Sequence, residues 1–204
     1  GEKESLPVSL YNGYYQKGKA LYAQGELEDA RDHFSKVIKP GYRATDRFLI
    51  RATYFSALTY ESLGESAKAS QLLDDMAAHL LDDGNSFSLA MVRGFQAELA
   101  LRQERLADAE NWFVSFTPAS HPRGDVSVND ELIATRILLK QGTPESLQEA
   151  AQRLLNYETY FRGIHNTRFL AETLAIKALV LLAQDQPPAA IATLEQALTL
   201  ALPG

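Results

Sequence analysis

The sequence predicts an all-α protein built from stacked helix pairs, and three observations lead to this prediction. A segment recurs five times along the 204 residues at a period of about 40, most clearly as AQGELEDARDHF (residues 23–34) and RQERLADAENWF (residues 102–113). Gly and Pro punctuate the chain between the copies, and no strand-like alternation competes with the helical pattern. Repeats of this length cannot bury their own apolar face, so they stack into a solenoid.

The reference position of the repeat is Gly25, at the break between the two helices of the first unit. Its equivalents follow at intervals of 39, 40, 38 and 43 residues and are Gly64, Glu104, Gly142 and Asp185. The fourth copy (residues 140–155) is slightly expanded.

Each unit is expected to fold as helix, short turn and helix, with ends set by Gly, Pro and capping residues. The expected helices cover roughly residues 6–24, 27–39, 44–63, 66–81, 86–103, 106–116, 129–141, 144–161, 167–184 and 187–200. Thr143 fits an N-cap with Pro144 at the first helical position, and residues 117–128 form the longest expected loop. The units then span about 6–40, 44–84, 86–117, 129–162 and 167–201, within a single domain, 1–204.

Small residues recur where the two helices of a unit are expected to cross, because they let the backbones approach. The first helices offer Gly18, Ala57, Ala97 and Ala178, with Thr135 as a bulkier exception. The second helices offer Ala30, Ala69, Ala109 and Ala190, with Ala150 or Ala151 in the expanded unit. Four residues later come larger residues that we also expect in the core: Phe34, Leu73, Phe113 and Leu194, with Leu154 or Leu155.

Composition narrows the possible functions. The chain is 46% hydrophobic with a net charge of −6, and no Lys/Arg cluster is dense enough for a nucleic-acid surface. It has no cysteine, no apolar run long enough to span a membrane and no signal peptide, so we expect a cytoplasmic location. Since the chain begins with Gly1, we expect a fragment of a larger protein.

The repeat resembles the tetratricopeptide repeat (TPR), with Gly18, Leu21, Ala30, Phe34 and Val37 in the family's small, apolar and aromatic positions. The longer period of about 40 resembles the sensor domain of LuxR-family bacterial regulators similar to MalT. The stretches NDELIATRILLKQG, EAAQRLLNYETYFRG and ETLAIKALVLLAQDQPPAAIATLEQALTLALPG carry that likeness most specifically. The resemblance implies a TPR-like α-α superhelix (solenoid) of about five helix pairs. It also implies an NTPase module before this region and a helix-turn-helix after it.

Other motifs carry little chemistry. GYYQKGKA (residues 13–20) matches a phosphate loop except that Ala20 replaces the final Ser/Thr, and no strand precedes it. The tripeptide Arg123–Gly124–Asp125 is a chance loop sequence. The four histidines share no helical face, and no nucleophile–base pair or Gly-x-Ser-x-Gly elbow occurs. We therefore expect no catalysis, no metal and no cofactor.

In a TPR superhelix the first helix of each unit lines the concave groove. We transferred the groove-facing positions of the family to each first helix by the register of the repeat. They predict a groove of aromatic, cationic and carboxylate side chains that could hold a polar ligand. The candidates are Tyr15, Lys19, Tyr22, Arg51, Tyr54, Glu98, Arg102, Arg136 and Lys140, with Asn12, Glu61, Asn129 and Glu172 beside them. The alternative is an ordinary solvated face on which ion pairs contribute little.

The sequence thus favours an effector-sensing and self-association domain of a LuxR/MalT-type transcriptional regulator. A small-molecule effector or a regulatory protein would bind in the groove, with neither nucleic acid nor membrane as a partner. The alternative is a stand-alone TPR scaffold for protein–protein interaction, and an enzyme built on helix pairs is a distant third. The last helix (AAIATLEQALTLALPG) is apolar enough that we expect another helix to pack on it in the larger protein. For the fragment we expect dimerisation that depends on concentration and that the downstream residues would weaken.

Overall fold

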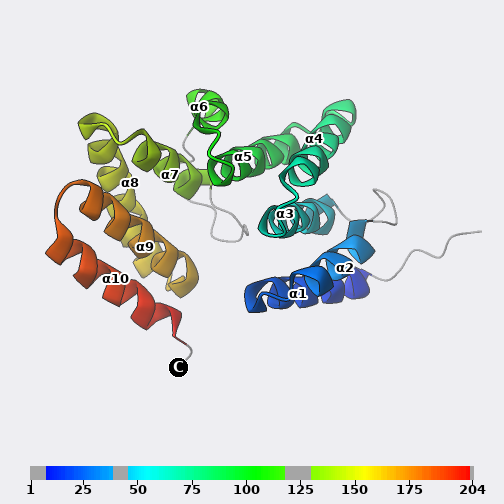
Figure 1. The fold of residues 1–204 in the computed structure, drawn as a ribbon, viewed down its shortest axis with the longest axis horizontal. Coiled ribbons are helices and arrows are strands. Elements are labelled where there is room, and N and C mark those ends of the chain that lie inside the picture. The colour runs from blue at the N-terminus through cyan, green and yellow to red at the C-terminus, as the bar shows by residue number, and fades with distance from the viewer. Residues whose placement is uncertain (1–7, 39–45, 118–129, 203–204) are drawn as a thin grey trace, which may run out of the picture. The chain divides into compact units, whose positions relative to one another are not determined.

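The computed structural model describes residues 8–38, 46–117 and 130–202, and these residues are almost entirely helical. Figure 1 shows the helices in chain order. They are α1 (Val8–Gln24), α2 (Leu27–Ile38), α3 (Asp46–Ser62), α4 (Ser66–Asp82), α5 (Ser86–Arg102), α6 (Leu106–Ser115), α7 (Asp130–Gln141), α8 (Pro144–Gly163), α9 (Thr167–Ala183) and α10 (Pro187–Ala201). Each helix begins and ends within two residues of its predicted position. The all-α, TPR-like fold class is confirmed.

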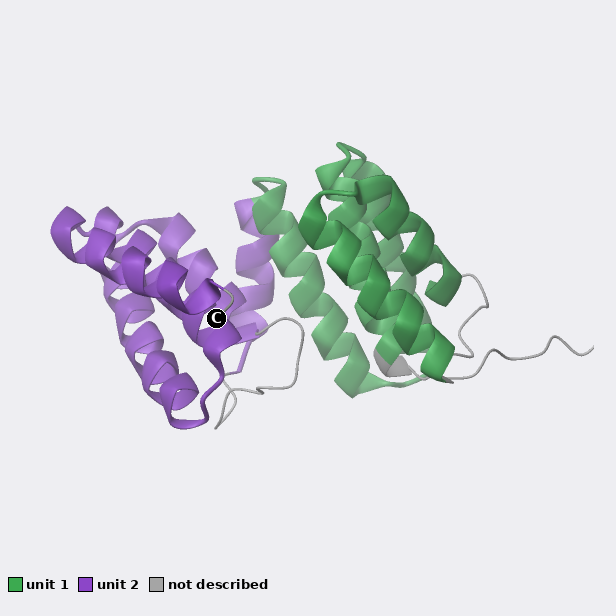
Figure 2. Ribbon diagram, turned by 90° about the horizontal axis from the view of Figure 1, so that it is seen from below, with its two compact units in different colours: residues 1–105 green, residues 106–204 purple. Residues whose placement is uncertain are grey.

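The chain divides into two compact units, residues 1–105 and 106–204 (Figure 2). We call α1, α3, α5, α7 and α9 the first helices of the repeat, and α2, α4, α6, α8 and α10 the second helices. In the first unit α1 packs on α2 and α3 on α4, while α2 and α4 each pack on the next first helix. In the second unit the same order joins α6 through α10. That all 204 residues form a single domain stays a prediction.

The turns inside the five helix pairs share one backbone conformation. All five reference positions have φ in the left-handed region, from 58° at Glu104 to 81° at Gly25. In four of these turns the amide that follows bonds back five residues, as from Glu65 to the carbonyl of Tyr60 at 2.8 Å. In the fourth pair the amide of Gly142 itself bonds the carbonyl of Leu138 at 3.3 Å. The five-residue bond is that of a Schellman cap, and the bond of Gly142 is that of the simpler left-handed cap; both end the helix and satisfy last-turn carbonyls. The sequence repeat thus reflects a turn that ends the first helix of each pair and recurs about every 40 residues.

The small residues do lie at close helix crossings. An ideal Cβ built on Gly18 would lie only 2.6 Å from Cε1 of Phe34, so the approach of α1 to α2 requires glycine there. The structure also decides the two ambiguous assignments of the expanded unit, because Ala150 and Leu154 are fully buried while Leu155 is 51% exposed. The other small crossing residues are buried as predicted: Ala30, Ala57, Ala69, Ala97, Ala109, Thr135, Ala178 and Ala190.

The larger residues of the repeat divide between core and surface. Phe34 and Leu73 are buried, and Phe113 is half-buried. The prediction of a core position is wrong for Leu194, which is 44% exposed. Unlike the earlier second helices, α10 has no first helix packed on its far side within the described residues of its unit.

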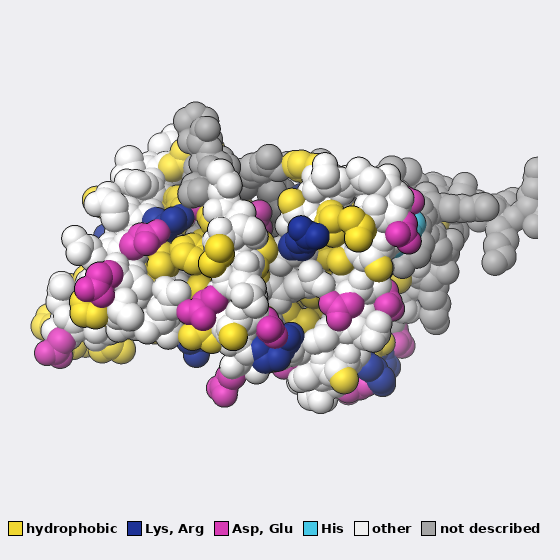
Figure 3. Space-filling view, turned by 90° about the horizontal axis from the view of Figure 1, so that it is seen from above, with side chains coloured by type: hydrophobic (Ala, Val, Ile, Leu, Met, Phe, Trp, Pro, Cys, Tyr) yellow, Lys and Arg dark blue, Asp and Glu magenta, His cyan; other side chains and the backbone are white. Residues whose placement is uncertain are grey.

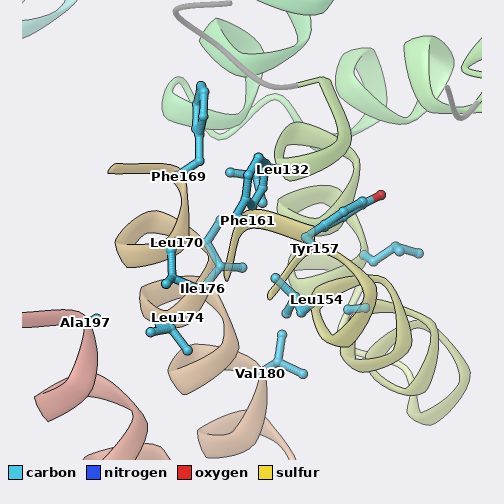
Figure 4. Packing of buried hydrophobic residues seen from close by; sticks show 12 residues of the cluster. Leu132, Leu154, Tyr157, Phe161, Phe169, Leu170, Leu174, Ile176, Val180 and Ala197 are labelled. Carbon is cyan, nitrogen blue, oxygen red and sulfur yellow. The ribbon is translucent and has the colours of Figure 1, made fainter. Parts of the chain in front are cut away.

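The core of the second unit gathers around α8 and α9 (Figure 4). Phe161 near the end of α8 stacks on Phe169 near the start of α9, with ring centroids 5.4 Å apart. Leu132, Leu154 and Leu174 join them from three helices. Each such buried side chain contributes roughly 1.5–3 kcal/mol. The start of α8 is capped as predicted, since Thr143 Oγ1 accepts the amide of Ser146 at 3.1 Å.

Candidate functional site

In the first unit, the aromatic candidates gather around Phe55 of α3 instead of facing outward. The ring of Phe55 lies 6.0 Å from Tyr15, 6.1 Å from Tyr22, 5.9 Å from Phe34 and 5.5 Å from Tyr54. Such edge-to-face and stacked pairs add about 0.5–1.5 kcal/mol each beyond their burial. This group joins α1, α2 and α3.

Tyr15 and Tyr54 therefore belong to the core. Only 2% of Tyr15 and 4% of Tyr54 is exposed. The ring of Tyr54 also packs on Phe95 of α5, 4.2 Å away. The prediction that these two side chains face an open groove is wrong, because each points at the neighbouring first helix and fills the space between two repeats.

Lys19 and Tyr22 lie at the edge of this aromatic group and are half-buried. The Lys19 amine is 5.4 Å from the ring centre of Tyr15 and 5.6 Å from that of Phe55. Cation–π contacts at this range contribute roughly 0.5–1 kcal/mol when exposed. Lys19 thus brings a positive charge to the rim of an apolar region.

The candidates on α3 and α5 differ in exposure. Arg51 is half-buried on α3. Glu98 on α5 is only 2% exposed, and its Oε1 accepts a bond from Nε of the exposed Arg102 at 3.1 Å. The prediction that the side chain faces an open groove is therefore also wrong for Glu98. A buried carboxylate needs such a charged donor, because removing it from water is costly.

The second unit brings two predicted residues into direct contact. Nη2 of Arg136 on α7 lies 2.7 Å from Oε1 of Glu172 on α9, and about a third of each side chain remains exposed (29% and 33%). Lys140, one turn later on α7, is exposed. The guanidinium, the carboxylate and the amine thus form a polar strip along two adjacent first helices.

Two charged groups around α8 were missed by the sequence analysis. The hydroxyl of Tyr157 donates a short hydrogen bond to the buried carboxylate of Glu131, and Nη1 of Arg153 lies 3.5 Å from it. Burial, and then the hydrogen bond to Glu131 and its charge, raise the pKa of Tyr157 well above its usual range. Tyr157 and Glu131 are 26 positions apart, so no local pattern signals the pair.

The second missed group centres on Glu158. Its carboxylate accepts bonds from Lys177 of α9 at 2.7 Å and from Arg162 at 2.8 Å. Burial alone would raise the pKa of Glu158, but the hydrogen bonds and charges of Lys177 and Arg162 outweigh it and hold the pKa below its usual range. These ion pairs join α8 to α9, which is typical of a structural role.

Several residues of the sequence analysis fall outside the described residues. They are the groove candidate Asn129, the loop tripeptide Arg123–Gly124–Asp125 and His121. Within the residues that are described, no group of three or more His, Asp or Glu side chains could hold a metal ion. No described helix is both long enough and apolar enough to cross a membrane. Acidic and basic side chains are interspersed on the face drawn in Figure 3.

The comparisons with known proteins agree with the repeat analysis. The chain matches the family model of the MalT-like TPR region over residues 2–204, which is nearly its full length. No curated protein matches the chain. The match spans all the described helix pairs, and a MalT-like TPR region is a type of helical sensor or interaction domain.

Proposed function

We propose that this chain, which belongs to the family of MalT-like TPR regions, is the effector-sensing and self-association domain of a bacterial LuxR/MalT-type transcriptional regulator. The match of the family model over residues 2–204 carries the proposal. DNA binding and nucleotide hydrolysis would belong to other parts of such a regulator. TPR-type helical domains are in general not catalytic, and we propose no reaction for this one.

The polar strip of the second unit is the best candidate for ligand contact. Arg136 presents a planar guanidinium that can hold a carboxylate or a phosphate through two parallel bonds, and its contact with Glu172 orients it. Lys140 adds a second cation on the same helix. An anionic metabolite or an acidic peptide would compete with Glu172 for Arg136.

Sensing would act through a shift between states of the helix stack. The helices α7 and α9 belong to successive repeats. A ligand that contacts Arg136 and Glu172 would therefore change how these two repeats pack on each other. It would favour the packing state that it binds better, by no more than its difference in affinity for the two states.

A thermal-shift screen against anionic and sugar metabolites tests the proposal. A ligand at a hundredfold excess over its Kd adds about 2.7 kcal/mol of stability, which appears as a rise of several degrees in Tm. We expect the rise to disappear in Arg136→Ala and to persist in Arg162→Ala, a control that removes an ion-paired arginine of a second helix. A hit that both variants keep would place the ligand elsewhere.

A plain protein–protein scaffold is the second candidate. The burial of Tyr15, Tyr54 and Glu98 favours it, because fewer polar groups are left on the first helices to hold a small molecule. The screen separates the two functions: if no compound raises Tm at any concentration, the scaffold replaces the sensor.

A further inference from the structure

Two first helices of the first unit carry cations at the positions where the second unit forms an ion pair. In the second unit, Arg136 lies six residues before the reference position of its repeat, and Glu172 lies thirteen residues before the next one. Their side chains are 2.7 Å apart. The same two positions in the first unit hold Lys19 on α1 and Arg51 on α3. Because α1 packs on α3 as α7 packs on α9, the repeat register predicts that these two cations face each other.

Aromatic contacts of the first unit place both cations at one helix junction. The ring of Tyr15, one turn before Lys19, lies 6.3 Å from that of Phe48 and 6.0 Å from that of Phe55. Arg51 lies between Phe48 and Phe55 on α3, and spacings of three and four residues put them on one face of the helix. The amine of Lys19 is 5.6 Å from the ring centre of Phe55. The side of α3 that carries Arg51 therefore faces the part of α1 that carries Lys19.

Carboxylates are scarce along these two helices. The sequence of α1 contains no Asp or Glu. That of α3 contains two, Asp46 and Glu61, near its two ends, and Glu61 accepts a bond from Gln103 at 2.6 Å. Lys19 and Arg51 are both half-buried, where like charges repel more strongly than in water. An anion bound between them would replace this repulsion with attraction.

The pair of like charges belongs to this junction and is not a general feature of the repeat. The junction of α3 and α5 has the apolar residues Leu58 and Met91 at the same two positions. The junction of α7 and α9 has the opposite charges of Arg136 and Glu172. Packing of successive repeats therefore does not require two cations at these positions, and an anionic ligand accounts for them better than packing does.

We propose that Lys19 and Arg51 form a binding site for the phosphate group of a small metabolite at the junction of α1 and α3. The planar guanidinium of Arg51 can donate two parallel bonds to phosphate oxygens, and the amine of Lys19 adds a compact second charge. A phosphate monoester carries a charge of about −1.5 to −2 at pH 7, which matches two cations better than the single charge of a carboxylate does. This site goes beyond the proposed function, because it lies in the first unit and involves neither Arg136 nor Glu172.

Phosphorus NMR of the probe ligands, titrated with the 204-residue chain, tests the site. With inorganic phosphate and glycerol phosphate as probes, we expect saturable line broadening. The Kd should rise by more than about tenfold in Arg51→Gln and in Lys19→Gln, the size expected when one charged donor is lost. Lys17→Gln is the matched control, because Lys17 is exposed on the same helix, and its Kd should change by less than about twofold. Lys19→Arg keeps the charge and should keep most of the affinity, and thermal unfolding verifies that each variant folds.

Several results would overturn the proposed phosphate site. They are the absence of saturable broadening with either probe, an equal loss of affinity in Lys17→Gln, and acetate that binds as tightly as phosphate at equal ionic strength. Glycerol phosphate that binds at least as tightly as inorganic phosphate supports a metabolite as the ligand. Binding of inorganic phosphate alone overturns the metabolite, because the site would then hold a free ion only.

The result is independent of the sensor proposed at Arg136. Arg136→Ala should leave the Kd of both phosphate probes unchanged. A chain that binds phosphate through Lys19 and Arg51, but gives no rise in Tm that depends on Arg136, contradicts the sensor and keeps the phosphate site. A chain with a ligand response at Arg136 and no phosphate binding contradicts the phosphate site and keeps the sensor.

Discussion

The side-chain amide of Gln184 donates a hydrogen bond to the backbone carbonyl of Leu147, 3.3 Å away, and joins two successive helix pairs. Gln103 makes the equivalent bond to the carbonyl of Ser66 at 3.2 Å, with the same spacing of 37 positions. Gln141, at the same place in its repeat, bonds Glu110 at 2.9 Å. A glutamine just before the left-handed turn residue thus joins each of these repeats to the preceding second helix by a side-chain hydrogen bond.

Replacing Gln103 with leucine should weaken the first unit. The amide also donates to Glu61 at 2.6 Å, and a bond to a charged group contributes about 1.5–3 kcal/mol. We expect Gln103→Leu to lose about that amount in urea unfolding. Gln24→Leu is the control, because Gln24 has the same place in the first repeat and is exposed, so its loss should stay below about 0.5 kcal/mol. If both variants lost the same free energy of unfolding, the hydrogen bonds of Gln103 would not be the cause of its loss.

Two glycines should respond to alanine in opposite directions. Gly64 has φ 78°, where alanine is strained, so Gly64→Ala should cost about 1 kcal/mol. Gly13 lies within α1 with nothing within 4 Å of an added Cβ, so Gly13→Ala should gain about 0.5–1 kcal/mol. Thermal unfolding measures both. A loss of stability in Gly13→Ala would show that its surroundings are tighter than described.

Removing the hydroxyl of Tyr157 should destabilise the second unit and change its response to alkali. Tyr157→Phe takes a donor from the buried Glu131, at a cost of about 1–3 kcal/mol. Because the pKa of Tyr157 is raised, its stabilisation is complete below pH 10.0, the ordinary value, and is lost as pH rises above it. The variant should therefore lose less stability than wild type between pH 10 and 12.

Urea unfolding as a function of pH measures that difference. Tyr14→Phe is the control, because Tyr14 is half-buried and its ring packs on His33. If the free energy of unfolding of the wild type and of Tyr157→Phe fell in parallel above pH 10, the proposed hydrogen bond of a buried Tyr157 hydroxyl would be contradicted.

The ion pairs of Glu158 should make stability depend on acid. Its pKa is lowered, so the stabilisation is present above pH 4.5, the ordinary value, and is lost as pH falls through the lowered pKa. At pH 7, Glu158→Gln should cost about 1.5–3 kcal/mol, the contribution of a hydrogen bond between charged groups. The gap between variant and wild type should close towards pH 3. A gap that stays constant across this range would show that packing, not charge, sets the loss.

Most of the fold could be predicted from the sequence because its determinants are local. Turn residues such as Gly64 end helices through their own backbone preference, and Thr143 and Pro144 start one through capping. The contact of Gly18 with Phe34 follows from the repeat pattern, because a small residue recurs wherever two helices of a pair cross. These features need only a few neighbouring residues and the 3.6-residue period of the helix.

The exposure of the polar candidates was decided by tertiary packing. Successive residues on a helix point about 100° apart, so a small rotation moves a side chain from an open face into a junction. Tyr15, Tyr54 and Glu98 are buried for this reason, while Arg136 stays half-exposed and reaches Glu172 on the next first helix.

The amino-acid pattern is enough to predict the ten helices of the described residues, their turns and their pairing, since each depends on short-range backbone preferences repeated every 40 residues or so. Which side chains the repeat junctions bury follows only from how the helices pack in three dimensions. Glu131 meets Tyr157 across 26 positions, and Leu194 is exposed where Phe34, Leu73 and Leu154 are buried. Both outcomes depend on whether a helix distant in sequence packs at that place, which local residue preferences do not encode.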